Sequence, residues 1–339
     1  MYIKKSSQFA PRAVLTNEMF EASLETSDEW IRKRTGITER RTALVEEPNR
    51  PIRFMAIEAV NALGLTEEEK KKIKHIIFAS GLAEENYPNV ANYIAKEFNI
   101  NAPGLRVNSA CSSFIAGLKF SSSLIEEGDV LLVSSESFTS IGDYSDKTSC
   151  VLLGDGSCAY LLSRDKTAYH IGDISLEGFG SDIINTGNPG ESPEKTVLEF
   201  CKETLPLLGK SLGIRQSASR SSYGSFRQNG KEVYKTILID IPKLLLKKIS
   251  KLKLVKGELA FIGHQANLRM LEKIVEKTGL KKSQHFYNVD KYGNTGSSGC
   301  GMVLHDVIEN ENLHSGQKLL ISAFGAGIVY GSAVVSRLK

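Results

Sequence analysis

Short runs of β-branched and other apolar residues recur along the first half of the chain, each bounded by polar or glycine-containing segments. These runs predict strands at residues 75–79, 105–108, 130–134 and 159–162. Between them, apolar residues three or four positions apart predict a helix over 52–63 and another that follows residue 111. This alternation is typical of an α/β protein in which helical crossovers join parallel strands.

The second half of the chain shows the same order of elements. Its patterns predict a long helix, a strand, two helices and two strands, at residues 231–251, 259–262, 266–278, near 303, 318–322 and 329–335. Each half has two closely spaced glycines before its last strand, in Gly154-Asp155-Gly156 and Gly325-Ala326-Gly327. We therefore predict two similar halves packed together, residues 1–170 and residues 171–339.

Residues 178–230 interrupt this pattern at the start of the second half. They are rich in glycine, serine, asparagine and proline, although residues 195–212 have helical composition. A loop region of this length inside a compact enzyme is commonly functional. We expect it to form a cap or a binding region rather than a linker.

The composition is that of an ordinary globular protein. A chain of 339 residues, 41% of them hydrophobic, can bury a sizeable core without disulfides. The net charge of +4 is too small to predict nucleic-acid binding. No apolar run reaches the ~18 residues of a membrane span, and the first residues lack the apolar core of a signal peptide. We expect a cytoplasmic protein that binds neither nucleic acid nor membranes.

The cysteines are five in number and have no closely spaced pairs. This pattern argues against a disulfide framework and a zinc ribbon, and it favours reduced thiols with no bound metal. For Cys150, Cys158 and Cys201 we predict the common role of a small buried side chain.

Cys111 differs from the other cysteines because it lies between a predicted strand and a predicted helix, within Asn108-Ser109-Ala110-Cys111-Ser112-Ser113. Free N–H groups and the helix dipole favour anions at a helix start, so we expect a lowered pKa and a reactive thiolate. A buried structural thiol is the alternative, and the local sequence leaves both interpretations open.

A reactive thiol needs partners, and two residues at similar positions are candidates. His264 lies at the end of a predicted strand and before a helix, and Asn294 lies in the glycine-flanked turn Tyr292-Gly293-Asn294-Thr295-Gly296. A structural histidine and an ordinary turn asparagine are the alternatives. The order Cys, His, Asn also occurs in papain-like proteases, but the segment around Cys111 does not have their Cys-Gly-Ser-Cys-Trp type of signature.

A series of short motifs runs along nearly the whole chain. They are Thr26–Ile31, Arg34–Ile37, Ala110-Cys111, Gly154–Gly156, Asn229–Lys235, His264–Arg269, Gly293–Thr295 and Phe324-Gly325. Together and in this order, they resemble β-ketoacyl-acyl-carrier-protein synthase III, one of the thiolase-fold condensing enzymes. The resemblance implies a thiolase-like α/β fold, with two similar halves in a five-layered α-β-α-β-α arrangement.

The resemblance also implies a mechanism. Cys111 would take an acyl group from an acyl-coenzyme A, and malonyl-acyl carrier protein would then bind with its carbonyl oxygen held by His264 and Asn294. Decarboxylation gives an enolate that attacks the acyl group, whose oxyanion would be held by the backbone N–H groups of Cys111 and Ala326. The product is a β-ketoacyl carrier protein. Coenzyme A enters as part of the substrate, and we expect no cofactor.

Several further residues match substrate-handling positions of the family. Trp30, Arg34 and Thr35 match residues that border the adenine of coenzyme A, while Thr26–Glu29 also has the pattern of a helix capping box. Lys147 stands where the family usually has a second adenine-stacking arginine, and lysine lacks that planar group.

Three positions imply macromolecular partners. Tyr87 matches an aromatic residue that the partner subunit inserts into the acyl pocket, which implies a homodimer. Lys235 and Arg269 match basic positions that receive the acidic carrier protein. For both residues, an exposed solvated charge is the alternative.

Residues 178–230, Ser112-Ser113 and Gly296–Gly299 depart from the common pattern of the family. These departures leave open the identity of the acyl group, the acceptor, and whether the enzyme initiates fatty acid synthesis or serves specialised metabolism. A non-condensing acyltransferase or a thioester hydrolase on the same fold is the alternative function, and a non-catalytic scaffold is a third. Asn294 favours decarboxylation, because simple acyl transfer needs no second donor to an enolate.

Overall fold

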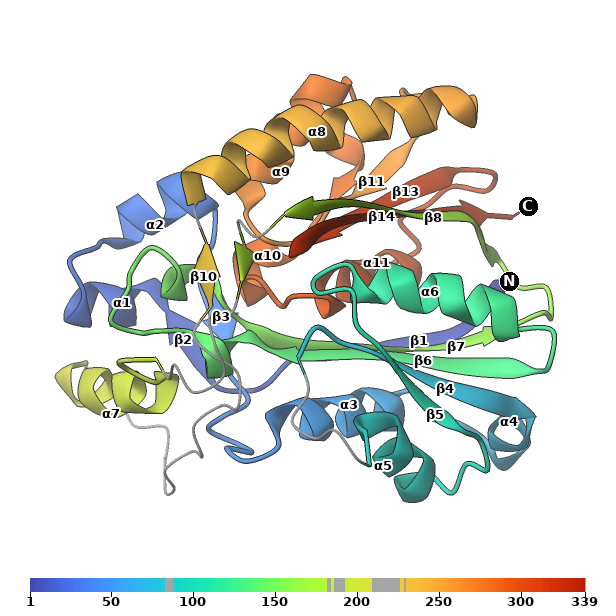
Figure 1. Cartoon of the computed structure of the whole chain (residues 1–339), viewed down its shortest axis with the longest axis horizontal. Coiled ribbons are helices and arrows are strands. Elements are labelled where there is room, and N and C mark those ends of the chain that lie inside the picture. The colour runs from blue at the N-terminus through green and yellow to red at the C-terminus, as the bar shows by residue number, and fades with distance from the viewer. Residues whose placement is uncertain (83–87, 182–183, 186–192, 209–225, 229, 339) are drawn as a thin grey trace.

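The computed structural model describes residues 1–82, 88–181, 184–185, 193–208, 226–228 and 230–338. Their helices and strands stack in five layers (Figure 1). From top to bottom in that view these are helices α8 and α9, one set of strands, helices α6 and α11, a second set of strands, and helices α3 and α5. The predicted α-β-α-β-α arrangement is confirmed.

The main strands form one continuous order, β12-β11-β13-β14-β8-β1-β7-β6-β4-β5. The first half supplies β1 Tyr2–Phe9, β4 Ile73–Ala79, β5 Gly104–Val107, β6 Asp129–Ser137 and β7 Asp155–Ser163. The second half supplies β8 Tyr169–Ser181, β11 Ala260–Ile262, β12 His285–Phe286, β13 Lys318–Gly325 and β14 Gly327–Arg337. Read outward from the β1–β8 junction, both halves place their strands in the same order. The division at residues 170 and 171, which falls inside β8, stays a prediction.

The helices follow the same repeat. The helices of the three helical layers are α3 Pro51–Ala62, α5 Val90–Glu97, α6 Ser113–Leu124, α8 Gly230–Lys251, α9 Leu268–Thr278 and α11 Ser298–Glu309. The other helices are α1 Asn17–Ser23, α2 Asp28–Thr35, α4 Glu67–Lys72, α7 Val197–Leu207 and α10 Val289–Tyr292. Two small ribbons pair β2 Val14–Thr16 with β3 Glu39–Arg41, and β9 Ile184–Asn185 with β10 Arg227–Gln228. Helix α7 falls within 195–212, where the sequence predicts helical structure.

The expectation of parallel strands is wrong for much of the sheet. Strands β4, β5 and β6 are parallel, as are β11, β12 and β13, because helical crossovers join them. Strands β7 and β14, however, run antiparallel to their neighbours. The reason is local for β14, because the single residue Ala326 separates β13 from β14 and reverses the chain direction.

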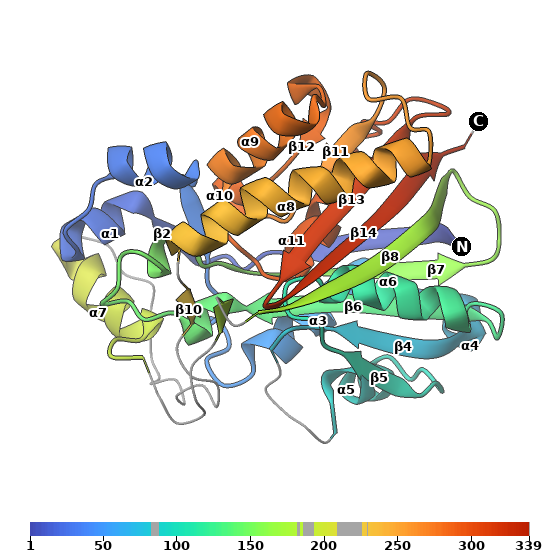
Figure 2. The same cartoon turned by 45° about the horizontal axis from the view of Figure 1, so that its top comes forward.

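The central layer contains α6 and α11, which lie between the two sets of strands (Figure 2). Ser113–Leu118 of α6 and Ser298–Leu304 of α11 are buried without interruption. Near their N-termini, both helices therefore carry apolar or small residues around their whole circumference. Cys111 lies just before the N-terminus of α6, and Asn294 lies just before the N-terminus of α11.

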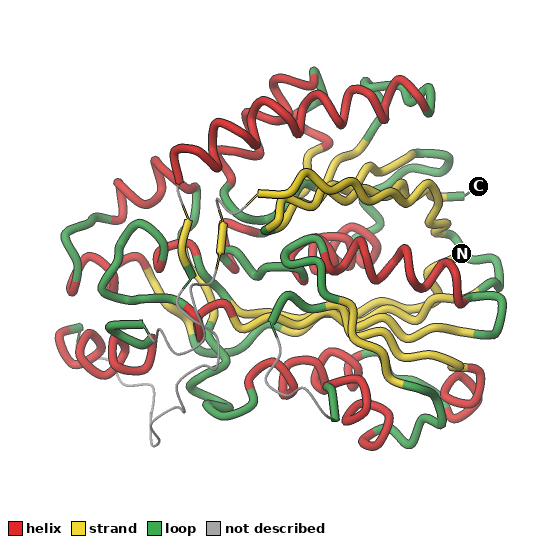
Figure 3. Tube along the Cα trace, viewed as in Figure 1, coloured by secondary structure: helices red, strands yellow, loops and turns green. Residues whose placement is uncertain are grey.

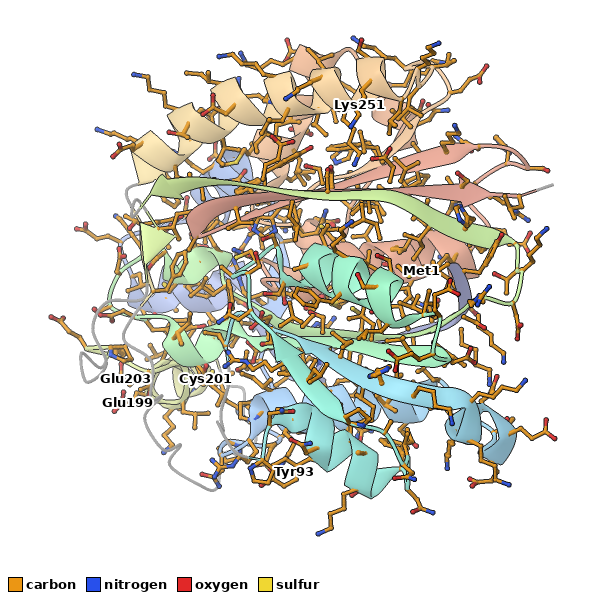
Figure 4. All side chains as sticks on the ribbon, turned by 45° about the vertical axis from the view of Figure 1, so that its right-hand side comes forward. Met1, Tyr93, Glu199, Cys201, Glu203 and Lys251 are labelled. Atoms are coloured by element: carbon orange, nitrogen blue, oxygen red, sulfur yellow. The ribbon has the colours of Figure 1, made fainter. Side chains whose placement is uncertain are left out.

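The peripheral helix α7 carries Cys201 beside Glu199 and Glu203 (Figure 4). Cys150, Cys158 and Cys201 are fully buried, as predicted for structural thiols, and burial raises the pKa of each above its ordinary value. Among the described residues, no helix is long and apolar enough to cross a membrane.

Candidate active site

Cys111 lies in the turn that joins β5 to α6, as the sequence predicts. The preceding residue, Ala110, has φ +47°, a left-handed conformation that residues other than glycine rarely adopt. Two side chains hold this turn. The Ala110 N–H donates to Asn108 Oδ1 at 3.0 Å, and the Ser109 N–H donates to Ser113 Oγ at 2.8 Å. The backbone around the thiol is therefore fixed before any substrate binds.

Ser112 and Ser113, which depart from the family pattern, help to build this turn. Both are fully buried. The Ser112 hydroxyl donates to the Ser109 carbonyl at 2.6 Å, and the Ser113 hydroxyl donates to the Ala110 carbonyl at 2.6 Å. Their hydroxyl groups point back to the backbone, so the departure at these positions changes how the turn is supported.

The expected lowering of the Cys111 pKa is wrong. Burial of the thiol raises its pKa to about 12, and the nearby Glu136 carboxylate adds to the increase. The residue as a whole keeps some exposed surface, but the sulfur packs against an apolar cluster. Loss of solvation outweighs the helix dipole. At neutral pH the group is therefore a thiol, and it must lose its proton as it reacts.

His264 lies between β11 and α9 and is 4% exposed. Its ring meets the ring of Phe324 edge to face, with the centroids 4.8 Å apart. Burial lowers the pKa of His264 to about 4, so the imidazole is neutral at pH 7 and has one N–H donor. Its buried Nδ1 has no hydrogen-bond partner within the described part of the chain. The ring therefore has hydrogen-bonding capacity at Nδ1 that the described residues do not use.

Asn294 lies in the turn between α10 and α11 and is 6% exposed. Its N–H donates to the Leu152 carbonyl at 2.7 Å, and its carbonyl accepts from the Gly154 N–H at 3.0 Å. The side-chain Oδ1 accepts from the Gly296 N–H at 3.0 Å. This bond uses the amide oxygen and leaves Nδ2 as the group that can donate to a ligand.

Phe324 and Gly325 connect these residues. Phe324 contacts His264, and a Cβ added at Gly325 would lie 2.7 Å from the Cys111 nitrogen. Ala326 follows Gly325 directly, in the turn between β13 and β14. Gly299, in the first turn of α11, approaches Gln265, the residue after His264, since a Cβ added at Gly299 would lie 2.9 Å from the Cβ of Gln265. We call Cys111, His264 and Asn294 the candidate centre.

Sequence reasoning missed Glu136, near the end of β6. It is fully buried, and its carboxylate accepts hydrogen bonds from backbone and hydroxyl donors of Ser80, Gly81, Leu82 and Ser297. Burial raises its pKa to about 7. The signal in the sequence is one acidic residue in a strand whose other residues after Asp129 are apolar or serine.

Two family models match the chain. One, described as 3-oxoacyl-[acyl-carrier-protein (ACP)] synthase III, matches residues 105–180, and the one for its C-terminal part matches residues 250–337. Beta-ketoacyl-[acyl-carrier-protein] synthase III 2 of Halalkalibacterium halodurans is 30% identical over 332 residues, which cover 96% of this chain and 93% of that protein. The chain belongs to the β-ketoacyl-acyl-carrier-protein synthase III family. The resemblance drawn from the motifs is confirmed.

Solved structures of synthase III proteins share the whole fold. The protein from Thermus thermophilus has a TM-score of 0.82 and 27% identity, and the one from Aquifex aeolicus VF5 has 0.81 and 26%. Each alignment covers 99% of both chains. The thiolase-like fold predicted for this synthase III family member is therefore confirmed.

Helix α2, which carries Trp30, Arg34 and Thr35, begins at Asp28, one residue later than it would if Thr26 were its N-cap. Ser27 is the N-cap of α2, and its hydroxyl accepts from the Trp30 N–H at 3.1 Å. The predicted capping box from Thr26 to Glu29 is therefore wrong, because Ser27 takes the capping role. The Arg34 guanidinium lies 5.3 Å from the centre of the Trp30 ring, so the cation covers the indole one turn along the helix.

Lys147 lies beside the segment that leads into α2. Its ammonium group donates to the Glu25 carbonyl and lies 3.8 Å from the Glu25 carboxylate. Trp30 packs against the cluster that contains Cys150 and Val151, which follow Lys147 closely in the chain. The structure therefore brings Trp30, Arg34 and Lys147 to one region, which we call the α2 rim.

Thr35, unlike its exposed neighbour Arg34, is buried. It is 4% exposed, and its hydroxyl donates to the Ile31 carbonyl at 2.7 Å and accepts from the Ile37 N–H at 3.0 Å. Both bonds hold the C-terminal end of α2. The structure thus gives Thr35 a local role, and places it away from the surface where a nucleotide would lie.

The two basic positions expected to receive the carrier protein differ. Lys235 is exposed on α8. Arg269, on α9, donates to the Arg32 carbonyl at 3.2 Å and forms an ion pair with Glu272 at 3.0 Å. Arg269 therefore joins α9 to the last turn of α2 as well as presenting a charge. Tyr87 lies outside the described residues.

Proposed function

We propose that this chain catalyses a decarboxylative Claisen condensation between an acyl-coenzyme A primer and malonyl-acyl carrier protein, giving a β-ketoacyl thioester. This is an acyltransferase of fatty acid synthesis initiation, or a specialised relative in lipid metabolism. The observation that supports the proposal is that Phe324, which contacts the buried neutral imidazole of His264, is followed by Gly325, which approaches the backbone of Cys111. The similarity to β-ketoacyl-acyl-carrier-protein synthase III proteins supports the same reaction class.

In the first step, the sulfur of Cys111 attacks the thioester carbonyl of the acyl-coenzyme A. A carbon–sulfur bond forms to Cys111, the bond to coenzyme A breaks, and the thiol proton passes to the departing coenzyme A sulfur. Because the pKa of Cys111 is about 12, the attack and the proton loss must be closely coupled. The backbone N–H groups of Cys111 and Ala326 stabilise the oxyanion of the tetrahedral intermediate.

In the second step, the malonyl thioester loses carbon dioxide. The electron pair of the breaking carbon–carbon bond moves onto the thioester carbonyl oxygen and forms an enolate. His264 and Asn294 Nδ2 donate to that oxygen. Since His264 is neutral, it acts as a hydrogen-bond donor without a formal charge, and its shielding from water strengthens the interaction.

In the third step, the enolate carbon attacks the acyl group on Cys111. The new carbon–carbon bond forms, the bond to the Cys111 sulfur breaks, and the sulfur leaves as a thiolate. Because its pKa is high, this thiolate readily takes a proton from water, and the enzyme returns to its starting state.

The outer parts of the site handle the substrates. Coenzyme A would place its adenine against Trp30 and Arg34, with Lys147 at the position of the second adenine-stacking residue, and Thr35 would support α2 from inside. The carrier protein, which is acidic, would bind near Lys235 and Arg269. We also propose a homodimer in which the partner's Tyr87 reaches the acyl pocket, a cytoplasmic location, and a reaction that needs no cofactor. These statements stay predictions.

Intact-mass measurement tests the first step. The wild-type protein should gain the mass of one acyl group from an acyl-coenzyme A series, and Cys111→Ala should gain none. No cysteine-dependent adduct with any member of the series would rule out the proposal. Release of carbon dioxide and a β-keto product after addition of malonyl-acyl carrier protein would then distinguish condensation from simple acyl transfer or thioester hydrolysis.

A further inference from the structure

Glu136 is a buried carboxylate that the three steps above do not use. It lies at the carboxyl end of β6, directly opposite Gly156 of β7. Its Oε1 accepts from the Gly81 N–H at 2.6 Å and from the Ser297 hydroxyl at 2.6 Å. Its Oε2 accepts from the Ser80 hydroxyl at 3.1 Å and from the Leu82 N–H at 3.2 Å. These donors come from two segments far apart in the sequence.

The first segment, residues 80–82, contacts the turn of the nucleophile. A Cβ added at Gly81 would lie 3.2 Å from the Cα of Ala110, so the two backbones are in direct contact. The Asn108 amide donates to the Gly81 carbonyl at 3.3 Å. Asn108 and Ala110 flank the strained turn that presents Cys111. Fixing Gly81 therefore fixes one side of that turn.

The second segment is the turn that presents Asn294. Ser297, which donates to Glu136, is three residues away and is 1% exposed. Gly296 lies between them and has φ +59°, and a Cβ added there would lie 2.9 Å from the Cγ of Glu136. The Gly296 N–H is the same group that orients the Asn294 amide. Fixing Ser297 and Gly296 therefore fixes the direction of the Asn294 donor.

We propose that Glu136 is a positioning residue, which ties the Cys111 turn to the Asn294 turn and so sets the distance between the nucleophile and the enolate donor. This inference rests on the proposed function. A carboxylate suits the task because it accepts several hydrogen bonds and donates none when ionised. An amide of the same shape would present an N–H group to donors on one side and lose those bonds.

Asp155 provides a matched control inside the same sheet. It is also a fully buried carboxylate, and it accepts from two backbone N–H groups and two hydroxyls, those of Ala43, Thr139 and Ser137. It lies next to Gly156 on β7, and within the described part of the chain no hydrogen bond joins its donors to Cys111, His264 or Asn294. A general need for buried carboxylates would affect both residues alike.

The decisive experiment compares Glu136→Gln, Ser297→Ala and Asp155→Asn with the wild type. In Glu136→Gln, kcat for decarboxylation of malonyl-acyl carrier protein should fall by about 100-fold, while KM changes by less than about threefold. Ser297→Ala should lose about tenfold in kcat, and the double variant should lose no more than Glu136→Gln alone, because the Ser297 bond is one of those that Glu136→Gln already disturbs. Asp155→Asn should lower Tm and leave kcat within about threefold.

The pH profile provides a second readout that a merely structural role would not change. The only ionisable side chain that faces Glu136 from the nucleophile turn is Cys111, and residues 80–82 and 296–297 present backbone groups and hydroxyls. On β7, the Asp155 carboxylate is directed to Ala43 and Thr139. Burial raises the pKa of Glu136 to about 7, so protonation removes an acceptor below that pH. Wild-type kcat should fall about tenfold from pH 8 to pH 6, and Glu136→Gln should lack this decrease.

The outcomes separate this inference from the function on which it rests. If the wild type neither acylates Cys111 nor releases carbon dioxide, the proposed function fails. If the wild type does both, an unchanged kcat in Glu136→Gln, or an equal loss in Asp155→Asn, overturns the positioning role. Should Glu136→Gln fail to fold, Ser297→Ala decides, because an unchanged kcat in that variant overturns the role as well.

Discussion

In the candidate centre, His264 and Asn294 are almost fully buried, whereas in the α2 rim Arg34 is exposed and Lys147 is partly exposed. Burial makes the groups of the centre neutral, since the Cys111 thiol keeps its proton and the His264 imidazole does not gain one. The rim keeps its charges in water. The centre therefore depends on geometry and unscreened hydrogen bonds, and the rim on screened electrostatics and stacking.

This difference predicts large effects from small changes in the centre and small effects from large changes in the rim. Figure 3 shows the loops and turns that connect the helices and strands, and Cys111 and Asn294 lie in such turns, whereas Trp30 and Arg34 lie within helix α2. In the centre those turns are pinned by buried hydrogen bonds, as at Asn294 and Cys111. The four predictions below test the contrast in order of decreasing effect.

Asn294→Ala should produce the largest effect. It removes one of two donors to the enolate oxygen, so kcat for decarboxylation should fall about 100- to 1,000-fold. Acylation of Cys111, measured by intact mass, should continue, because that step does not use the amide. If decarboxylation keeps its wild-type rate, Asn294 is not an enolate donor.

Gly325→Ala should slow acylation by about 100-fold. The new Cβ would lie 2.7 Å from the Cys111 nitrogen and would displace the turn that holds the thiol. Gly178→Ala is the matched control, because Gly178 also lies in a long strand and has no atom within 4 Å of the added Cβ. Equal acylation rates in the two variants would contradict the close approach of β13 to Cys111.

The burial of His264 should make stability depend on pH. Its folded pKa of about 4 is below the ordinary value of 6.5, so the unfolded chain binds more protons between these pH values. Above pH 6.5 His264 is neutral in both states and has no effect on the free energy of unfolding. As the pH falls from 6.5 towards 4, the free energy of unfolding decreases, by about 2 kcal/mol at pH 5. Wild-type Tm should therefore drop more between pH 7 and pH 5 than the Tm of His264→Asn. The same drop in both proteins would assign the effect to other groups, such as the partly buried His285, whose pKa is also lowered.

Arg34→Ala should produce the smallest effect. It removes a cation from an exposed stacking site, so KM for acyl-coenzyme A should rise about two- to fivefold with kcat unchanged. Lys147→Arg should lower KM by about twofold, since the planar guanidinium can stack where an ammonium cannot. Lys33→Ala, also exposed on α2, serves as the control and should match the wild type. A change in kcat in Arg34→Ala would break the distinction between rim and centre.

The sequence by itself was sufficient for many of the regular elements and for the family. Helices such as α8 and α9 and strands such as β6 and β13 were predictable because their apolar residues follow a simple period. Strands β1 and β8 were missed, since polar residues such as Lys4, Lys5 and Asp173 interrupt their apolar positions. The motifs around Cys111, His264 and Asn294 determined the family because they are local patterns in a fixed order.

The tertiary structure alone decided the electrostatics and the supports of the site. The pKa of Cys111 rises because residues distant in the sequence enclose the sulfur, and no local pattern records that enclosure. The same holds for Thr35, which turns inward, and for Glu136, whose donors lie 54 to 161 residues away along the chain. Desolvation and hydrogen bonding between distant segments depend on packing, and packing exists only once the chain has folded.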